Sequence, residues 1–514
     1  MTVSALQPPA SIGVRPGGHR RHVIALAVIC TVAASCYALL SLVKFGLHRA
    51  SVFDLVIFDQ AVRGWSGFGL PYSPAVGVNK FGVVDFLQLA DHFSPILALL
   101  APLYWIHDGP ATLLVAQAVL FTLAVPWIWR YTRRRMGTAP AYLVSVAYLI
   151  SWPVAQAVNF DFHEVAFVPV LTAIMIERFD AGRILPGSLA AFGLLLVKED
   201  MGLLVSGFGL YLLVTRRWAV GAAFVAGGLS AMALTRNVLI PAAGGDSAYF
   251  WAYNHLGPDV ASAALHVLGD PIGTLALLFS HGAKIGTIGL LLWPVLFACL
   301  ASPLIVPAIP LVLERLLSDR VLWWQADFQY NAFVIVIVML AAVDGVTRIT
   351  RWIALATHRE PEADDPAEDT PDGPAPAPDP RDQVRARVIG TSWAACVLTV
   401  SVTLLPNFAF KQLVDPAFYR STPRTAAAEE AISKVPDGVT VEAVNHLGPA
   451  LSARTTVLLW DNTPRNAPWV VADTLQWAYP FASADRQREQ IDTLLQSGYK
   501  IVYDRDGFLV LNRG

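Results

Sequence analysis

The sequence VIALAVICTVAASCYALLSLV, residues 23–43, contains no charged side chain over 21 residues. About 20 apolar residues in a helix cross the hydrocarbon core of a bilayer. Arginines precede the segment, and no clear cleavage site of small residues comes before Lys44. The pattern therefore predicts an uncleaved first transmembrane helix that follows a cytoplasmic tail, residues 1–22.

The composition of the whole chain also indicates a membrane protein. Hydrophobic residues make up 55% of the 514 positions and charged residues 15%, whereas a soluble domain carries about 25% charged residues. These values exclude a single soluble enzyme and a disordered chain. The net charge is −2 and no basic, aromatic-rich stretch occurs, so we expect no nucleic-acid partner. The four cysteines lie in apolar runs without metal-type spacing.

Apolar segments recur along most of the chain. Their lengths and the Lys/Arg bias of short loops predict about eleven spans, with the N-terminus cytoplasmic and the C-terminus extracytoplasmic. The shorter apolar stretch before Ile106 suits a half-inserted or interfacial helix, and residues 242–283 suit an outer loop. The predicted spans are 23–43, 110–130, 140–158, 165–177, 185–197, 201–215, 218–240, 284–300, 303–317, 330–347 and 388–405.

The domain organisation follows from these segments. Residues 360–382 hold nine acids, one arginine and seven prolines, a composition that cannot bury enough surface to fold. Short strands and two helices are predicted after the last span, with Asp506-Gly507 as a hairpin turn. The predicted parts are a transmembrane core 23–347 with an outer loop 44–92, a disordered cytoplasmic linker 348–387, a last transmembrane helix 388–406 and an extracytoplasmic α/β domain 407–514.

Ionisable residues gather in the predicted outer loops. Such groups near hydrocarbon are costly and mark functional cavities. Asp54 follows the first span and is suited to accept a proton from a bound hydroxyl, or to cap a helix. Asp59 is five residues away, so the two carboxylates project at different angles from a helix.

Three further clusters have alternative readings. Asp91-His92 heads the short half-helix. The histidine is suited to bind phosphate or to donate to a carboxylate; alternatively the pair is a helix cap with an interfacial histidine. Asp161, His163 and Glu164 suit either a divalent metal or a hydrogen-bonded network. The Lys198-Glu199-Asp200 cluster places a lysine near the membrane surface, to bind phosphate or to reach the lipid headgroups.

Four ordered motifs carry a resemblance to a known family. They are Phe53-Asp54-Leu55-x-Ile57-Phe58-Asp59-Gln60, His92-Phe93-Ser94-Pro95, Asp161-Phe162-His163-Glu164 and Lys198-Glu199-Asp200. Together they resemble an uncharacterised family of prokaryotic multi-spanning membrane proteins, over about residues 45–350. That family looks like a branch of the GT-C membrane glycosyltransferases, which use polyprenyl-phosphate-linked sugars.

The resemblance implies a mainly α fold, a polytopic GT-C-like transmembrane helix bundle with a small α/β extracytoplasmic C-terminal domain. It implies a glycosyltransferase of the bacterial plasma membrane that moves a sugar from a polyprenyl-phosphate donor to an envelope glycan, lipid or protein. Asp54 would be the catalytic base and Lys198 would bind the donor phosphate; a divalent metal is a further candidate. Residues expected to line the cavity are Asp59, Gln60, Asp91, His92, Asp161, His163, Glu164, Glu199, Asp200 and Tyr330.

Two other functions fit the sequence. Intramembrane acids, histidines and lysines also occur in transporters and lipid flippases, although no internal repeat is found in this chain. A non-catalytic scaffold that acts through residues 407–514 is the second alternative. It predicts that changes at Asp54 and Lys198 have no effect.

Overall fold

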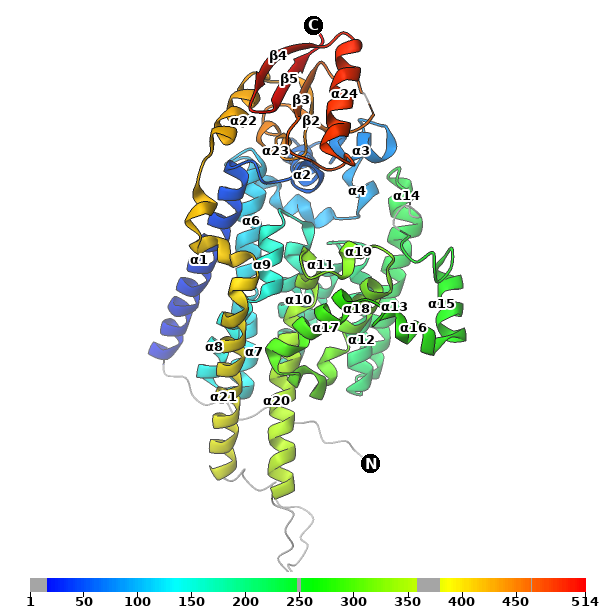
Figure 1. The fold of residues 1–514 in the computed structure, drawn as a ribbon. Coiled ribbons are helices and arrows are strands. Elements are labelled where there is room, and N and C mark those ends of the chain that lie inside the picture. Colours follow the sequence, from blue (N-terminus) through cyan, green and yellow to red (C-terminus); the bar gives the residue numbers. More distant parts are fainter. Residues whose placement is uncertain (1–15, 247–250, 358–379, 464) are drawn as a thin grey trace, which may run out of the picture.

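The structure, a computed structural model, describes residues 16–246, 251–357, 380–463 and 465–514. A bundle of helices forms most of it, and a small sheet lies at one end with the C-terminus (Figure 1). We refer to the end of the bundle that carries this C-terminal domain as the domain end.

Five helical segments are long and apolar enough to cross a membrane within the described ranges. The first is α1 (Pro16–Gly46), which contains the predicted first span. The others are Pro110–Met136, Thr138–Asn159, Trp218–Ala242 and Arg381–Asn407. They are built from α6 (Pro110–Thr122), α7 (Val125–Met136), α8 (Thr138–Leu149), α9 (Trp152–Asn159), α13 (Trp218–Leu234), η4 (Thr235–Leu239), α14 (Ile240–Ala242), α21 (Pro380–Leu404) and η9 (Leu405–Asn407).

The predicted total of about eleven spans is not confirmed. Most of the remaining predicted spans fall on helices no longer than 14 residues. At about 1.5 Å per residue, such a helix is roughly 21 Å long, less than the roughly 30 Å hydrocarbon core. These elements are α10 (Phe167–Asp180), α11 (Ile184–Leu195), α12 (Met201–Val214), α17 (Gly282–Leu292), η5 (Trp293–Val295), η6 (Ala298–Ala301), η7 (Pro303–Ile305) and α18 (Ala308–Leu317).

The segment predicted as an outer loop, 242–283, contains two apolar helices instead. Helix α15 (Val260–Gly269) and helix α16 (Pro271–Leu277) meet at a bend of 107°. Asp259 and Asp270 cap them, and each accepts a backbone N–H at 2.8 Å. Asp270 caps the second helix, and Pro271 follows it at the first helical position. This pair starts a new helix at the bend, and the hydrophobicity of the segment does not reveal such a start.

The linker predicted at 348–387 is helical at both ends. Helix α20 (Ile335–Thr357) continues into it, and α21 begins at Pro380. Polar turns extend both helices past their apolar parts, so hydropathy places the ends too early. The intervening residues 358–379 lie outside the described ranges.

The segment between α1 and α6 is mostly helical and lies between the bundle and the C-terminal domain (Figure 1). The short apolar helix predicted before Ile106 is present as Pro95–Tyr104. The elements are η1 (Val52–Val56), α2 (Ile57–Ser66), α3 (Pro74–Phe81), α4 (Gln88–Asp91), η2 (Pro95–Leu100) and α5 (Ala101–Tyr104). Later connections contain η3 (Glu164–Ala166), α19 (Val321–Trp324) and η8 (Gln329–Phe333).

The C-terminal domain is the predicted small α/β unit. Its strand order is β2-β1-β3-β5-β4; β1 pairs in parallel with β2 and β3, and β5 pairs antiparallel with β3 and β4. Asp506 and Gly507 have φ of 50° and 84° and make the predicted hairpin turn. The elements are η10 (Ala409–Val414), η11 (Pro416–Tyr419), α22 (Pro423–Ser433), β1 (Thr440–Ala443), α23 (Gly448–Leu451), β2 (Thr456–Leu459), β3 (Trp469–Asp473), α24 (Ala484–Gln496), β4 (Lys500–Arg505) and β5 (Phe508–Asn512).

The core of this domain includes side chains from the first loop. Val52, Val56, Ile57 and Phe86 are buried in one cluster with residues of the sheet, such as Val457. The predicted loop 44–92 and the predicted domain 407–514 therefore share one hydrophobic core. This sharing fixes the position of η1, which contains Asp54, against the sheet.

Candidate functional site

Asp54 lies in η1, a single π-helical turn shortly after α1, and its side chain faces His163. Asp54 Oδ1 is 3.2 Å from His163 Nε2, and the Ser51 hydroxyl donates to Asp54 Oδ2 at 3.3 Å. The N-cap of this turn is Ser51, so helix capping does not explain the carboxylate. The Asp54 side chain is 22% exposed and therefore accessible to a substrate.

The loop around Asp161 fixes the position of His163. Asp161 Oδ2 accepts the Ser51 backbone N–H at 2.9 Å, and Lys44 Nζ is 3.4 Å from Oδ1. Gln117 donates to the Asp161 carbonyl at 2.8 Å and accepts the His163 N–H at 3.1 Å. Asp161 has φ of 102°, a strained value that the surrounding contacts maintain.

Glu164 connects this loop to the next one. Its Oε1 is 3.7 Å from Lys198 Nζ. Within the described residues, Glu164 Oε2 and His163 Nδ1 are buried without a hydrogen-bond partner. Buried polar atoms are nearly always paired, so these two atoms suggest contacts that a bound molecule or water would complete.

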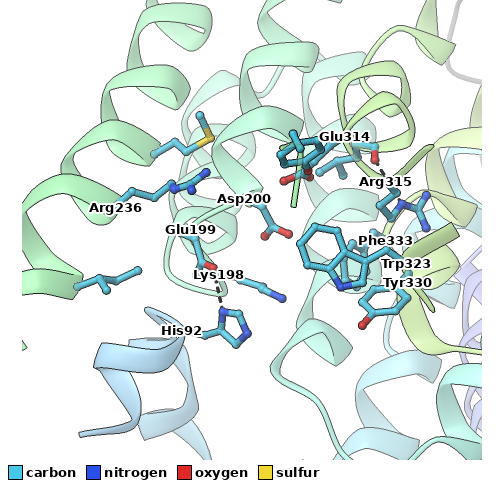
Figure 2. A pocket seen from close by; sticks show the side chains of 14 residues that line it. His92, Lys198, Glu199, Asp200, Arg236, Glu314, Arg315, Trp323, Tyr330 and Phe333 are labelled. Carbon is cyan, nitrogen blue, oxygen red and sulfur yellow. Dashed lines mark hydrogen bonds and ion pairs between the residues drawn. The ribbon is translucent and has the colours of Figure 1, made fainter. Parts of the chain in front are cut away.

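The loop between α11 and α12 presents Lys198, Glu199 and Asp200 together (Figure 2). His92 Nδ1 lies 2.8 Å from Glu199 Oε1, and the Phe93 N–H donates to Glu199 Oε2 at 3.3 Å. Asp200 Oδ1 is buried and unpaired among the residues that the structure describes.

These side chains open into a pocket with a cavity volume of about 60 Å³. Figure 2 shows Tyr330, Trp323 and Phe333 across the pocket from Lys198. Its walls are therefore basic, acidic and apolar together. The lining residues are His92, Lys198, Glu199, Asp200, Met232, Arg236, Ile240, Tyr253, Leu311, Glu314, Arg315, Trp323, Tyr330 and Phe333.

Several ionisable side chains in the loops around Asp161 and Lys198 have shifted pKa values. Burial raises the pKa of Asp161 to about 6, against the opposing effect of Lys44. Burial raises the pKa of Asp200 as well, which favours its neutral form. Burial would lower the pKa of Lys198, but the surrounding carboxylates outweigh it and raise this pKa. Lys198 is therefore a permanent cation in the pocket.

Burial would also raise the pKa of Glu199, but the charge of His92 outweighs it, and the pKa falls. Glu199 therefore remains ionised and orients the imidazole. The pKa of His163 is raised, because the Asp54 charge outweighs the effect of burial.

Six of the residues predicted to line the cavity lie outside the lining of this pocket. Asp161, His163 and Glu164 form the polar network described above, and the other three have different surroundings. Asp59 is fully buried, accepts the Tyr104 hydroxyl at 2.7 Å and pairs with Arg63 at 2.9 Å. Gln60 donates to the Val457 carbonyl at 2.8 Å, across to the C-terminal domain.

Asp91 pairs with Lys80 at 2.6 Å. None of the three lines the pocket beside Lys198. These contacts join parts of the segment between α1 and α6 to one another or to the C-terminal domain.

Two arginines of the pocket were not among the predicted residues. Arg236 interrupts the apolar run 218–240, and Arg315 lies at the end of 303–317. A charge within a predicted span is the signal that would have identified both. Gln117, which holds the Asp161 loop, was also not predicted. It is the one amide side chain in the apolar run 110–130, and a polar side chain in such a run is a similar signal.

A metal at Asp161, His163 and Glu164 is not favoured. The three side chains face different partners. Asp161 contacts Lys44 and Ser51, His163 faces Asp54, and Glu164 faces Lys198. No group of three or more His, Cys, Asp or Glu side chains suited to a metal occurs among the described residues. The arrangement is a polar network.

The fold of this chain is GT-C-like. It is similar to ArnT from Cupriavidus metallidurans in the apo state, with a TM-score of 0.53, 12% identity and coverage of 96% of this chain and 98% of that chain. ArnT bound to undecaprenyl phosphate gives a TM-score of 0.50 with the same identity and coverage. The archaeal oligosaccharyltransferase AglB from Archaeoglobus fulgidus, in complex with an inhibitory peptide and a dolichol-phosphate, gives 0.41, 11% identity and coverage of 94% and 74%.

The family is shown by sequence. The family model described as "Predicted membrane protein (DUF2079)" matches residues 49–510, and the chain belongs to this family. The comparison with curated proteins finds no match. The resemblance noted from the four motifs is thereby confirmed for the family, and the predicted GT-C-like fold agrees with the similarity to ArnT.

Proposed function

We propose that this protein transfers a sugar from a polyprenyl-phosphate donor to a cell-envelope acceptor at the domain end of the bundle. The observation that carries the proposal is a continuous polar path. It runs from Asp54 to His163, and from the adjacent Glu164 to Lys198 in the pocket. The path joins a partly exposed carboxylate to a pocket that contains three cationic side chains, Lys198, Arg236 and Arg315.

The pocket suits a lipid-linked phosphate. Lys198, Arg236 and Arg315 supply positive charge, and charge-assisted hydrogen bonds to phosphate are among the strongest in proteins. Met232, Leu311 and other apolar side chains supply a surface for the first part of the lipid chain. ArnT, which has a similar fold, was crystallised with undecaprenyl phosphate, and this supports the ligand class.

Asp54 is the proposed base. It takes the proton of the acceptor hydroxyl while the hydroxyl oxygen bonds to the anomeric carbon of the donor sugar. The bond from that carbon to the phosphate oxygen breaks, and the polyprenyl phosphate leaves with the electron pair. A positioned base typically contributes about 10²–10⁴-fold. Compensation of the leaving phosphate charge by Lys198 would supply the larger electrostatic share.

This proposal includes a topology. The N-terminus would be cytoplasmic, and the C-terminal domain would face the outside of a bacterial plasma membrane, where envelope glycans, lipids and proteins are available as acceptors. The clusters of Arg133, Arg134 and Arg135, and of Arg216 and Arg217, support a cytoplasmic location of the opposite end.

Binding of undecaprenyl phosphate to the purified protein tests the donor site. We expect Lys198→Gln to weaken binding roughly tenfold to a hundredfold, the effect of one charged hydrogen bond. Lys284→Gln is a control, because Lys284 is a buried lysine that lies outside the pocket and donates to the Leu277 carbonyl at 2.9 Å. Equal affinities of the wild type and Lys198→Gln would contradict the assignment of Lys198.

A further inference from the structure

A second pocket lies between the end of α1 and the C-terminal domain, separate from the pocket beside Lys198. Its walls are the turn Leu47–Arg49, the first turn of α22 and the loops after β1 and β3. Because β1 and β3 are parallel, both loops leave the same edge of the sheet. Ligands of open α/β sheets bind at this carboxyl edge.

The lining presents aromatic faces. Trp477 is 55% exposed and Tyr479 is 45% exposed. Such large aromatic side chains bury most of their surface in a folded domain unless they serve an interface or a ligand. Both belong to the loop after β3, so the same loop presents two flat surfaces to the pocket.

The lining includes two arginines and no carboxylate, and an ion pair compensates the charge of one of the two. Arg424 is paired with Asp473, which also lies 3.3 Å from His446 Nε2. Arg49 donates to the Phe418 carbonyl at 3.4 Å. A highly charged ligand would meet only the single charge of Arg49 here, whereas a neutral polar ligand would find many partners. The uncharged polar residues of the lining are His48, Thr422, Thr425, Asn445, His446 and Gln476.

His48 has unused hydrogen-bonding capacity. Within the described ranges, neither ring nitrogen of this imidazole has a hydrogen-bond partner, although both are buried. A neutral imidazole offers one donor and one acceptor, and a hydroxyl group can serve either role. Ligand hydroxyls would therefore satisfy both nitrogens.

The pocket adjoins the turn that carries Asp54. The Asn445 backbone carbonyl accepts the Val52 N–H at 2.8 Å, and the Asn445 side chain accepts the Phe53 N–H at 3.2 Å. The Phe53 ring packs edge-on against Tyr479 at 5.2 Å. A molecule held in this pocket therefore contacts the residues that support Asp54.

We propose that this pocket binds the sugar part of a neutral glycan, which is the acceptor of the transfer reaction. The apolar C–H face of a pyranose stacks on an aromatic ring, and its hydroxyls pair with amide, hydroxyl and imidazole groups. The assignment as acceptor rests on the proposed function, whereas glycan binding itself does not.

Binding to the full chain, without donor, tests the proposal. The probes are chitotetraose, mannotetraose and cellotetraose, followed by saturation-transfer NMR and a titration. We expect at least one to bind, and Trp477→Ala and Tyr479→Ala each to weaken it about tenfold. Tyr419→Ala is the matched control, because Tyr419 is 40% exposed but lies outside the lining. Binding of none of the probes, or an equal loss in Tyr419→Ala, would overturn the proposal.

Two outcomes separate this inference from the proposed transfer. In the first, the protein turns over no donor but binds a glycan, and Trp477→Ala abolishes this binding. This result would support the glycan-binding pocket and contradict the proposed transfer. Donor turnover with an acceptor KM that is the same in Trp477→Ala and the wild type would retain the transfer and reject this pocket as the acceptor site.

Discussion

Asp54 and Asp59 lie five residues apart in one helical segment but have different surroundings. Asp59 is fully buried and contacts Arg63, Tyr104 and the Ser452 hydroxyl. Asp54 is 22% exposed and has His163 as its ion-pair partner. The Asp59 carboxylate therefore stabilises the contact with the C-terminal domain, while the Asp54 carboxylate remains accessible.

Stability measurements should separate these two roles. We expect Asp59→Asn to lower the free energy of unfolding by about 1–3 kcal/mol, because it leaves buried partners of the carboxylate unpaired. Asp54→Asn should lower it by less than Asp59→Asn does, because Asp54 is partly exposed and loses one ion-pair partner rather than several buried contacts. Thermal unfolding of both variants in detergent measures the difference. A larger loss for Asp54→Asn would mean that Asp54 is structural.

The activity should depend on the protonation of His163. Asp54 raises the pKa of His163 above its ordinary value of about 6.5. The ion pair between Asp54 and the protonated His163 is complete below about pH 6.5 and is lost as the pH rises through the raised pKa of His163. Loss of the imidazolium charge makes Asp54 a stronger base, so we expect the transfer rate to rise over this pH range. In His163→Gln this rise should disappear; an unchanged pH profile would contradict the role of His163.

At the scale of elements, the close contact between α23 and η1 positions Asp54. A methyl group added to Gly448 would collide with the Val52 side chain, two residues before Asp54. A crowded core site yields by displacing its neighbours.

Gly448→Ala should therefore reduce transfer at least about tenfold and lower stability by about 1–3 kcal/mol. Gly46→Ala is the control, since nothing lies within 4 Å of a methyl group there. Rates and unfolding temperatures of the two variants should be compared. Equal rates in Gly448→Ala and the wild type would show that this contact does not position Asp54.

Local signals explain which elements were predictable from the sequence. The strands of the C-terminal domain and the Asp506-Gly507 turn were confirmed, because alternation and turn residues are short-range features. The bend between α15 and α16 and the helical ends of the linker were missed. They depend on caps and on polar turns, to which a hydropathy window does not respond.

At the scale of the whole molecule, the site depends on contacts between distant segments. The motifs indicated Asp54, His163, Glu164 and Lys198, and the structure brings these four together. The charge of Arg315 in an apolar run is a local signal, but only the packing of α18 places this side chain in the pocket. The sharing of one core between the first loop and the C-terminal domain is similarly a tertiary feature.

The proposed topology places the two ends of the molecule on opposite sides of the membrane. In a variant without native cysteines, we expect Asp485→Cys in α24 to react with a membrane-impermeant maleimide on whole cells. Arg183→Cys, before α11, should react only after the cells are permeabilised. Both positions are exposed. Labelling of Arg183→Cys but not Asp485→Cys on whole cells would reverse the topology.

Donor turnover tests the central claim most directly. The purified protein is incubated with a panel of polyprenyl-phosphate sugars, divalent metal and envelope extract, and release of free polyprenyl phosphate is followed by mass spectrometry. We expect release with at least one donor, and its loss in Asp54→Asn while that variant remains folded. Absence of release with every donor from folded protein would contradict glycosyl transfer and favour a lipid flippase or a scaffold.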